Sequence, residues 1–408
     1  MRNHSNKIPV STNHEFARLM AQATRLTQAG DLSGATAAVK AALVSVKAQV
    51  GQTVFMHGQG DQPRGGHFGA PAATPPASHP ATQAADRSDV IEVQAREVSD
   101  HGAAGHHGTQ ATDTLLSQGE FLALSHVDAS GTRAYKLFVP PQALVGTREL
   151  LPLLVMLHGC SQNPDDFAAG TRMNDLARRR GWFVLYPAQG HDANASRCWN
   201  WFVPAHQQRG TGEPESIAGM VRAVLHRYGV DARRVFVAGL SAGGAMAANV
   251  AAAYPELFSA VGVHSGLRAG AASDLNSALV AMHQGALPAQ SNGDRGDAGD
   301  GTAAAAPTIV IHGDQDNTVH PLNGDRLMAS LAIGSEPHTE RDLVQGRNYT
   351  RRIWRNGRGQ VQAEHWVIHG SGHAWSGGST AGSYSDASGP DASAAMLDFF
   401  SAQHRQDR

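Results

Sequence analysis

The sequence predicts an α/β fold with a mostly parallel central sheet and helices on both faces, and two observations support this. From Gly119 onward, short runs rich in β-branched and aromatic residues alternate with segments of helix-forming residues. This alternation is typical of parallel strands joined by crossover helices. The run LPLLVML at 151–157 is apolar throughout, which indicates a strand covered on both faces.

The predicted elements follow one another closely along the chain. Two strands flank the turn Asp128–Gly131, and the strand 151–157 comes next. A helix opens at Asn163 and Pro164, since asparagine caps a helix and proline suits its first turn. The later elements are this helix, running to about Arg180; a strand at 182–186; a helix at 215–228; a strand at 235–238; a helix at 242–254, ended by Pro255; strands at 258–263 and 308–311; a hairpin at 351–368, turning at Asn356-Gly357; and a helix from about Asp391.

Residues 1–50 predict a separate helical hairpin. Two stripes of apolar residues repeat at helical spacing, at 16–26 and 35–50, on either side of a break at Gly30-Asp31. A lone hairpin cannot bury both stripes. We therefore expect it to dock as an accessory segment on the main domain, with a partner-binding module as the alternative.

The rest of the chain divides by composition. Residues 51–118 are mostly Gly, Pro, Ala, His and Gln with few large apolar groups, and indicate a disordered linker. Residues 119–408 form the predicted α/β domain. Within it, residues 270–306 turn low in complexity, and we expect a surface insertion without regular structure.

Charge and hydropathy exclude several classes of protein. The 408 residues carry a formal net charge of −2 with a pI of about 6.9, so no basic field would hold nucleic acid. No run of 18 apolar residues predicts a membrane span. The first 30 residues contain no legible signal peptide. The two cysteines, Cys160 and Cys198, could form one disulfide, which would suggest an oxidising compartment.

The stretch VFVAGLSAGGAMA places Ser241 where a strand becomes a helix. Glycines at 239 and 243 would let the chain turn sharply and push the hydroxyl out of the sheet, as in the nucleophile elbow of catalytic serines. With 45 glycines in the chain, a small-residue turn that contains a serine by chance is the alternative. The strand before Ser241 and the helix after it favour the nucleophile.

A serine nucleophile needs a base and an orienting acid. The stretch TIVIHGDQDNTVHP supplies Asp314 and Asp316 after a buried strand, and EHWVIHGSGHAWSGG supplies His373 in a glycine-rich loop. The chain order Ser, Asp, His fits the elbow. The spacing alone leaves both aspartates open as the acid.

No cofactor or metal is expected. His365, His369 and His373 are spaced by fours, which would align metal ligands only on a helix, and the intervening glycines disfavour one.

Backbone amides are expected to form an oxyanion hole. One donor is the residue after the nucleophile, Ala242, and the other comes from the loop His158-Gly159-Cys160 after the strand 151–157. We expect the Cys160 amide as the second donor and His158 as a hydrogen-bonding organiser of the loop.

Five stretches together resemble the polyhydroxybutyrate depolymerase family of esterases, which has the α/β-hydrolase fold. They are LLVMLHGCSQNPDDFA, CWNWF, VFVAGLSAGGAMA, HGDQDNTVHP and GSGHAWSGG, and the resemblance covers about residues 119–404. It implies that Asp316 is the acid, with Asp314 as the fallback. It also implies a disulfide between Cys160 and Cys198.

The resemblance implies a serine esterase acting through Ser241, His373 and Asp316. The family's extracellular depolymerases carry a further C-terminal polymer-binding domain, for which no sequence follows the last predicted helix here. We therefore expect short-chain hydroxyalkanoate esters or oligomers as substrates. The alternatives are a feruloyl or acetylxylan esterase on the same fold, and a non-catalytic polymer- or granule-binding protein.

Two expectations remain open from the sequence. Trp199, Trp201 and Trp375 are candidates for aromatic walls of the substrate cleft, with plain core packing as the equal alternative. The resemblance and the possible disulfide suggest an extracellular protein, whereas the absence of a legible signal peptide suggests a cytoplasmic one.

Overall fold

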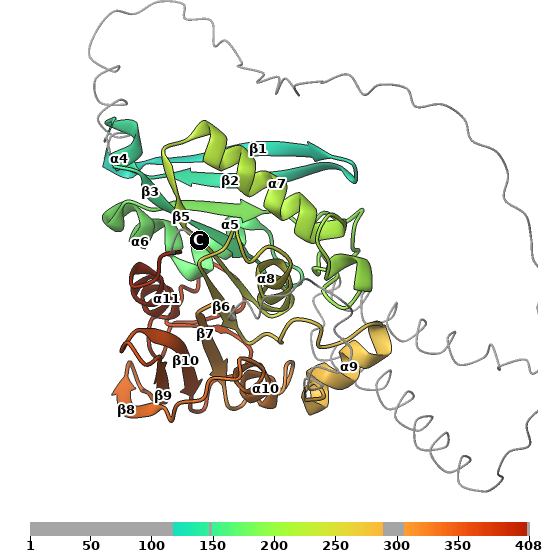
Figure 1. Cartoon of the computed structure of the whole chain (residues 1–408), viewed down its shortest axis with the longest axis vertical. Helices are drawn as coiled ribbons and strands as arrows, with labels where there is room; N and C mark the ends of the chain where they lie inside the picture. Colours follow the sequence, from blue (N-terminus) through green and yellow to red (C-terminus); the bar gives the residue numbers. More distant parts are fainter. Residues whose placement is uncertain (1–116, 147–148, 289–305, 406–408) are drawn as a thin grey trace, which may run out of the picture. The chain divides into compact units, whose positions relative to one another are not determined.

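The computed structural model describes residues 117–146, 149–288 and 306–405, and its largest element is a ten-stranded sheet (Figure 1). The described residues belong to the compact unit 99–408. The hairpin predicted for 1–50, and all but the end of the linker predicted for 51–118, lie outside them.

The strand order of the sheet is β1-β2-β4-β3-β5-β6-β7-β10-β9-β8. The six strands from β4 to β10 in this order are parallel neighbours, and antiparallel pairs extend both edges. The strands are β1 Glu120–Asp128, β2 Gly131–Val139, β3 Leu151–Leu157, β4 Phe183–Pro187, β5 Val230–Leu240, β6 Ala260–His264, β7 Thr308–Gly313, β8 His338–Val344, β9 Arg347–Arg355 and β10 Val361–Ile368; β11 Trp375–Ser376 and β12 Ser385–Asp386 form a separate parallel pair.

Helices cover both faces of the sheet. They are α4 Pro141–Leu144, α5 Pro164–Thr171, α6 Met173–Arg180, the 3₁₀ turn η1 Pro204–His206, α7 Gly212–Arg227, α8 Ala242–Ala253, α9 Leu275–Gln284, α10 Leu322–Ser330 and α11 Ala392–Ser401. Helices α7, α8, α9 and α10 contribute to one apolar cluster, and α5, α6 and α11 contribute to a second.

The alternation of side chains along the central strands separates these two clusters. Leu153 and Val155 of β3 belong to the cluster with α7 and α8, whereas Leu154 and Met156 belong to the cluster with α6 and α11. All four are fully buried. The continuous apolar run of β3 is therefore explained by two cores, and the predicted α/β fold with a mostly parallel sheet is confirmed.

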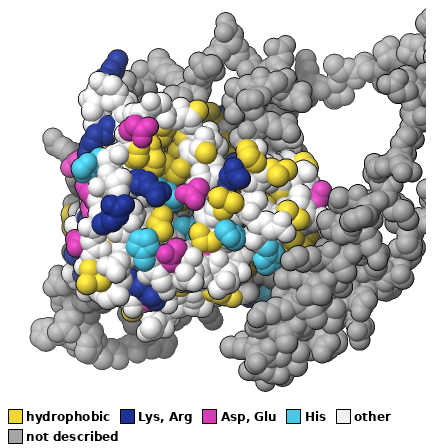
Figure 2. Space-filling model, turned by 90° about the horizontal axis from the view of Figure 1, so that it is seen from below, with side chains coloured by type: hydrophobic (Ala, Val, Ile, Leu, Met, Phe, Trp, Pro, Cys, Tyr) yellow, Lys and Arg dark blue, Asp and Glu magenta, His cyan; other side chains and the backbone are white. Residues whose placement is uncertain are grey.

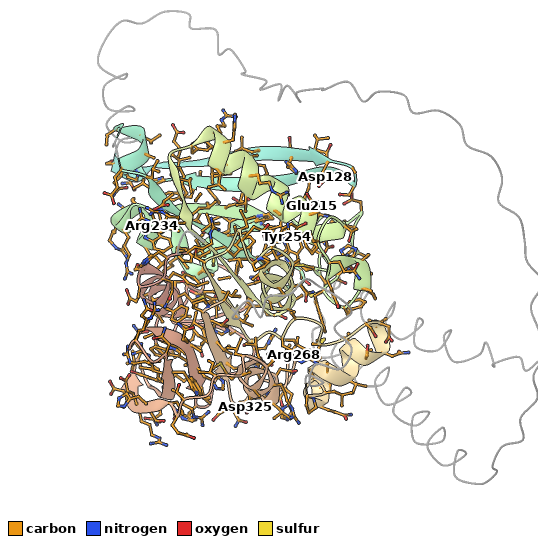
Figure 3. All side chains as sticks on the ribbon, viewed as in Figure 1. Asp128, Glu215, Arg234, Tyr254, Arg268 and Asp325 are labelled. Carbon is orange, nitrogen blue, oxygen red and sulfur yellow. A yellow bond between two sulfur atoms is a disulfide. The ribbon has the colours of Figure 1, made fainter. Side chains whose placement is uncertain are left out.

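Helices α7 and α8 pack against each other on one face of the sheet. Tyr254, which follows α8, donates its hydroxyl to the carboxylate of Glu215 in α7 (Figure 3). The amide of Gly210 donates to the same hydroxyl over 2.8 Å. This polar link fixes the carboxyl-terminal end of α8, the helix that follows Ser241.

Most predicted elements are present, with differences that have local causes. The helix predicted from Asn163 to about Arg180 is two helices, because Arg172 takes the left-handed conformation with φ 53°. Asn163 caps α5 as predicted, its side chain accepting from the amide of Asp166. Strand β8 was not predicted, since it is largely exposed and carries few apolar residues.

Part of the predicted insertion at 270–306 has regular structure. Helix α9 lies within it and is capped by Asp274, whose carboxylate accepts from the amide of Ser277 over 2.8 Å. The Ser277 hydroxyl in turn accepts from the amide of Asp274 over 3.1 Å. This reciprocal cap and two buried alanines, Ala278 and Ala281, give the segment the local order that its composition did not indicate.

The surface seen in Figure 2 mixes acidic, basic and histidine side chains with apolar ones, and neither sign of charge dominates it. This agrees with the net charge of −2. In the described residues no helix is long and apolar enough to cross a membrane.

The closest backbone approach around α8 gives a stability prediction. A Cβ at Gly243 would overlap the carbonyl oxygen of Leu157 and lie 2.5 Å from that of His158. We expect Gly243→Ala to lower the free energy of unfolding by about 3 kcal/mol, because backbone atoms cannot yield as side chains do. Urea denaturation measures this.

The matched control is Gly357→Ala in the β9–β10 turn, where a Cβ would meet no atom within 4 Å. We expect this change to stay within about 0.5 kcal/mol of the parent. Equal stability of the two variants would contradict the packing argument.

Candidate active site

Ser241 lies at the turn between β5 and α8 with backbone angles φ 59° and ψ −121°. A non-glycine residue rarely adopts a positive φ, so the surrounding structure must hold it there. The Ser241 amide donates to the carbonyl of His264 over 2.9 Å, and its carbonyl accepts from Ala245 over 3.0 Å. The predicted strand-to-helix turn is thus present, with the serine at its apex.

Asp316 and His373 meet at the carboxyl ends of β7 and β10. The Nδ1 atom of His373 lies 2.7 Å from Oδ2 of Asp316. The other carboxylate oxygen accepts from the amides of Thr318 and Val319, over 2.9 and 2.8 Å. These bonds fix the carboxylate and set the orientation of the imidazole ring.

Buried hydrogen bonds keep Asp316 ionised. Its side chain has no solvent exposure, and burial alone would raise its pKa. Hydrogen bonds from His312 and His373 outweigh this and hold the pKa of Asp316 well below its usual value. His312, whose Nε2 lies 3.4 Å from Oδ2, was not singled out from the sequence.

Asp314 makes a second pair with a different histidine. Its Oδ2 lies 2.8 Å from Nδ1 of His369, and its Oδ1 accepts from the amide of Gly370 over 2.7 Å. The Nε2 atom of His369 is 2.9 Å from the hydroxyl of Thr350. The structure therefore separates the two aspartates that the spacing left open, and it is Asp316 that contacts His373.

His264 links the serine turn to the histidine loop. Its carbonyl holds the Ser241 amide, while its ring nitrogen Nε2 accepts from the amide of Ser376 over 3.1 Å. Its ring stacks on Trp375 with centroids 4.9 Å apart. Sequence reasoning missed this residue, because a histidine that ends a buried strand gives no motif of its own.

The loop His158-Gly159-Cys160 passes beside the serine. A Cβ at Gly159 would lie 3.7 Å from Cβ of Ser241. The Gly159 amide donates to the side chain of Gln162 over 2.9 Å. Within the described residues the amides of Cys160 and Ala242 donate to no protein acceptor, and Ala242 begins α8, where helical amides lack partners.

Cys160 and Cys198 form a disulfide with Cα atoms 4.2 Å apart. With a sequence separation of 38 residues, the bond contributes roughly 3–4 kcal/mol in the chain-entropy account. It ties the loop that carries the Cys160 amide to the segment before Trp199. The described residues contain no other cysteine.

Comparisons with known proteins find similarity to esterases. A family model described as esterase PHB depolymerase matches residues 133–333. This region is therefore similar to the PHB depolymerase esterase family. The matched region contains Ser241, Asp316 and both cysteines, whereas His373 lies beyond its end.

Individual proteins similar to this chain are named as a depolymerase and an esterase. Poly(3-hydroxyalkanoate) depolymerase C of Paucimonas lemoignei is 32% identical over 63% of this chain and 63% of its own length. Feruloyl esterase B of Neurospora crassa is 38% identical over 30% of this chain and 42% of its own. The chain thus spans less than two thirds of either relative. A solved acetyl xylan esterase from Aspergillus awamori shares the fold, with a TM-score of 0.54 and 21% identity over 70% of this chain and all of that one.

The three tryptophans considered for the cleft are all buried. Trp199 and Trp375 are 0% and 1% exposed, and Trp201 is 4% exposed. The Trp199 indole donates to the carbonyl of His158 over 3.1 Å, and that of Trp375 donates to the hydroxyl of Ser393 over 3.0 Å. These contacts favour the packing alternative, in which Trp199 is fixed to the backbone of the His158 loop and Trp375 to α11.

Glu213 organises the segment after the disulfide and was also missed. It is 1% exposed and accepts from the side chain of Gln189 and from the amide and side chain of Asn200, over 2.6 to 2.8 Å. Burial raises its pKa, but hydrogen bonds from His206, Gln189 and Asn200 lower it below the usual value overall. An acidic residue in the first turn of α7 has the pattern of an exposed helix end, and only the folded segment that contains Gln189 and Asn200 shows that it is buried.

The three histidines spaced by fours do not converge. His369 pairs with Asp314, His373 pairs with Asp316, and His365 lies inside the sheet with Nδ1 3.8 Å from Asp325. In the part of the chain that the structure describes, no group of three or more His, Cys, Asp or Glu side chains is arranged to hold a metal ion.

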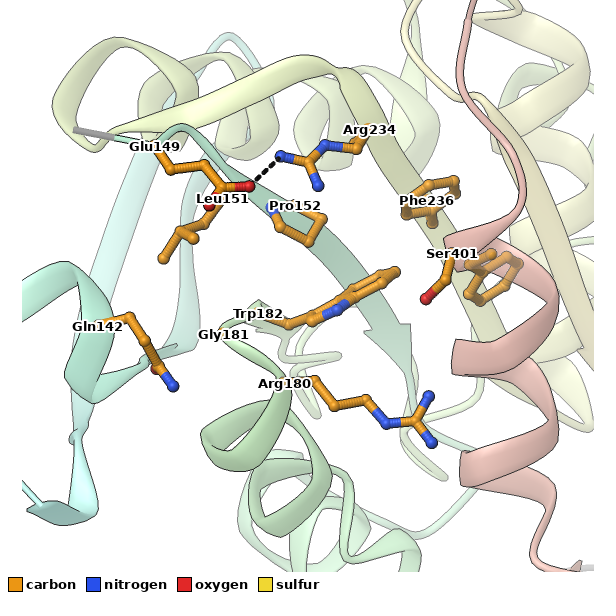
Figure 4. A pocket seen from close by; sticks show the side chains of 11 residues that line it. Gln142, Glu149, Leu151, Pro152, Arg180, Gly181, Trp182, Arg234, Phe236 and Ser401 are labelled. Carbon is orange, nitrogen blue, oxygen red and sulfur yellow. Dashed lines mark ion pairs between the residues drawn. The ribbon is translucent and has the colours of Figure 1, made fainter. Parts of the chain in front are cut away.

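A hollow of about 370 Å³ lies at the opposite, amino-terminal edge of the strands (Figure 4). Its lining includes Arg180, Trp182 and Arg234. Arg180 pairs with Asp398 over 2.5 Å, and Arg234 pairs with Asp231 over 2.9 Å. Because these cations are already paired and the catalytic candidates lie at the other edge, the hollow is not part of this site.

Buried neutral histidines predict acid sensitivity. Burial lowers the pKa of His158 to about 4, and the pKa values of His264 and His365 to about 3. In the unfolded chain a histidine titrates near 6.5. Between these values the unfolded chain binds more protons than the folded one, so the free energy of unfolding falls as the pH drops from about 6.5 towards 4.

His365→Leu tests this away from the serine turn. In wild type the free energy of unfolding falls as the pH drops from 6 to 4.5. We expect the slope of this fall to be smaller in the variant by up to about 1.4 kcal/mol per pH unit, because one protonation step is removed. Urea denaturation at several pH values measures the slope. An unchanged slope would mean that His365 protonates equally in both states.

Proposed function

We propose that this chain is a serine esterase that hydrolyses carboxylic esters through an acyl-enzyme. The observation that carries the proposal is the Asp316–His373 hydrogen bond at the same edge of the sheet that presents Ser241 at a strained turn. The match of residues 133–333 to the PHB depolymerase esterase family model supports the reaction class.

In the first half-reaction, Nε2 of His373 removes the proton of the Ser241 hydroxyl as Oγ attacks the ester carbonyl carbon. Asp316 accepts the Nδ1 proton of His373 in a hydrogen bond and stabilises the imidazolium that forms. The carbonyl oxygen becomes an oxyanion that accepts from the amides of Ala242 and Cys160. When the carbon–oxygen bond to the alcohol breaks, His373 delivers its proton to the leaving oxygen.

In the second half-reaction, water attacks the acyl-serine with His373 again acting as the base. The oxyanion is held by the same two amides, and collapse releases the acid and restores the Ser241 hydroxyl. The disulfide supports this step as well as the first, since it anchors the loop of the Cys160 amide.

For the substrate we propose short-chain hydroxyalkanoate esters or oligomers, as the name of the Paucimonas relative suggests. A feruloyl or acetylxylan ester is the second candidate, and the Neurospora relative favours it. Purified protein assayed on hydroxybutyrate oligomers, polyhydroxybutyrate film, methyl ferulate and acetylated xylan distinguishes them. The disulfide supports an extracellular location in this proposal.

The nucleophile is tested by Ser241→Ala. We expect kcat/KM on p-nitrophenyl butyrate to fall at least about a thousandfold, since a triad without its nucleophile loses covalent catalysis. The melting temperature should stay within a few degrees, because only a hydroxyl is removed. Near-normal turnover by the variant would overturn the proposal.

The acid is tested by comparing two aspartates on one loop. Asp316→Asn should lower kcat by orders of magnitude, because the amide stabilises the wrong tautomer of His373. Asp314→Asn is the matched control, and we expect its kcat to stay within about tenfold of wild type, since its partner is His369. The reverse ranking would assign the catalytic role to Asp314.

A further inference from the structure

Tyr384 has an unusual combination of backbone strain and exposure. Its φ is 51°, a left-handed conformation that is an outlier for a bulky aromatic residue. Its side chain is nonetheless 48% exposed, so burial of the ring does not offset the strain. Residues held in this way concentrate at functional sites.

The neighbours of Tyr384 hold it in place from both sides. Its carbonyl accepts from the amide of Trp375 over 2.7 Å. On the other side, Ser383 donates its amide and hydroxyl to the carboxylate of Asp166, over 2.8 and 2.5 Å. The Ser383 carbonyl accepts from the side chain of Gln162 over 3.0 Å.

Gln162 joins this segment to the expected oxyanion loop. Its Oε1 accepts from the amide of Gly159, the residue before Cys160, while its Nε2 donates to Asp166 and Ser383. It is 1% exposed, so these bonds are shielded from water. One buried amide therefore fixes Tyr384 relative to the Cys160 amide.

The ring of Tyr384 lies beside the catalytic histidine candidate. The two ring centroids are 6.4 Å apart, with the planes at 78°. In the proposed mechanism His373 passes its proton to the oxygen of the departing alcohol, so the alcohol part of the ester must lie against His373. A rigid, exposed aromatic ring at the edge of that imidazole would meet the alcohol part rather than the acyl part.

We infer that Tyr384 forms a wall of the subsite for the leaving alcohol and favours esters whose alcohol part is apolar or aromatic. This inference rests on the proposed esterase function and names the specificity of one half of its substrate. Contact with an aromatic ring is worth about three- to tenfold in kcat/KM. The tyrosine hydroxyl is not required for such contact.

Two ester series measure the inference. At constant acyl group, phenyl butyrate is compared with methyl butyrate; at constant alcohol, phenyl acetate is compared with phenyl hexanoate. For Tyr384→Ala we expect kcat/KM to fall about three- to tenfold on phenyl butyrate and less than twofold on methyl butyrate. The phenyl acetate to phenyl hexanoate ratio should not change.

Two further variants separate the ring from the backbone. Tyr384→Phe should keep the wild-type preference for phenyl over methyl butyrate, because the ring remains. Tyr384→Gly should lose that preference as Tyr384→Ala does, although glycine tolerates the positive φ and should melt at a higher temperature than the alanine variant.

The outcomes distinguish this inference from the proposed function. An equal loss on phenyl and methyl butyrate, or a loss that follows acyl length, would overturn the leaving-group role while leaving the esterase intact. Wild-type protein that hydrolyses none of the esters would overturn the proposed function and this inference with it.

Discussion

The packing of α8 onto the carboxyl end of β3 is the constraint on which the site depends. Gly243 lies so close to the carbonyls of Leu157 and His158 that no side chain fits between them. This contact brings the serine turn against the loop of the expected oxyanion donors. It also forces Ser241 into its positive φ, since the helix must begin immediately after the strand. The tightly packed cores on the two faces of the sheet supply the stability that offsets this backbone strain.

Buried polar groups then align the loops that follow the other strands. His264 holds Ser241 through its carbonyl and Ser376 through its ring, so one residue spans the serine and histidine loops. Glu213 holds the segment after the disulfide by accepting from the amide of Asn200. Gln162 holds the segment of Tyr384 by donating to the carbonyl of Ser383. Each of these side chains is nearly or fully buried and hydrogen-bonded. Such networks fix one arrangement, because any other would leave a buried polar group without a partner.

The two aspartate–histidine pairs have different surroundings although they lie on the same two loops. The Asp316 side chain is fully buried, and that of His373 is 11% exposed. Asp314 and His369 are 32% and 42% exposed, and they pin the acid and base loops together near the surface. Low dielectric around the inner pair strengthens its electrostatic interaction. The outer pair fixes the two loops relative to each other, but solvent screening keeps its contribution to the free energy of unfolding small.

The sequence by itself determined the fold class, the serine turn and the chain order of the three catalytic candidates, because these follow from local patterns of apolar residues, glycine and loop position. The tertiary structure decided what depends on distant contacts. It placed Asp316 rather than Asp314 on His373, buried the three tryptophans, and revealed His264 and Glu213. Asp314 and Asp316 stand two residues apart, so their spacing left both open and only the family resemblance favoured Asp316. Which carboxylate contacts which histidine depends on how one loop folds against the other.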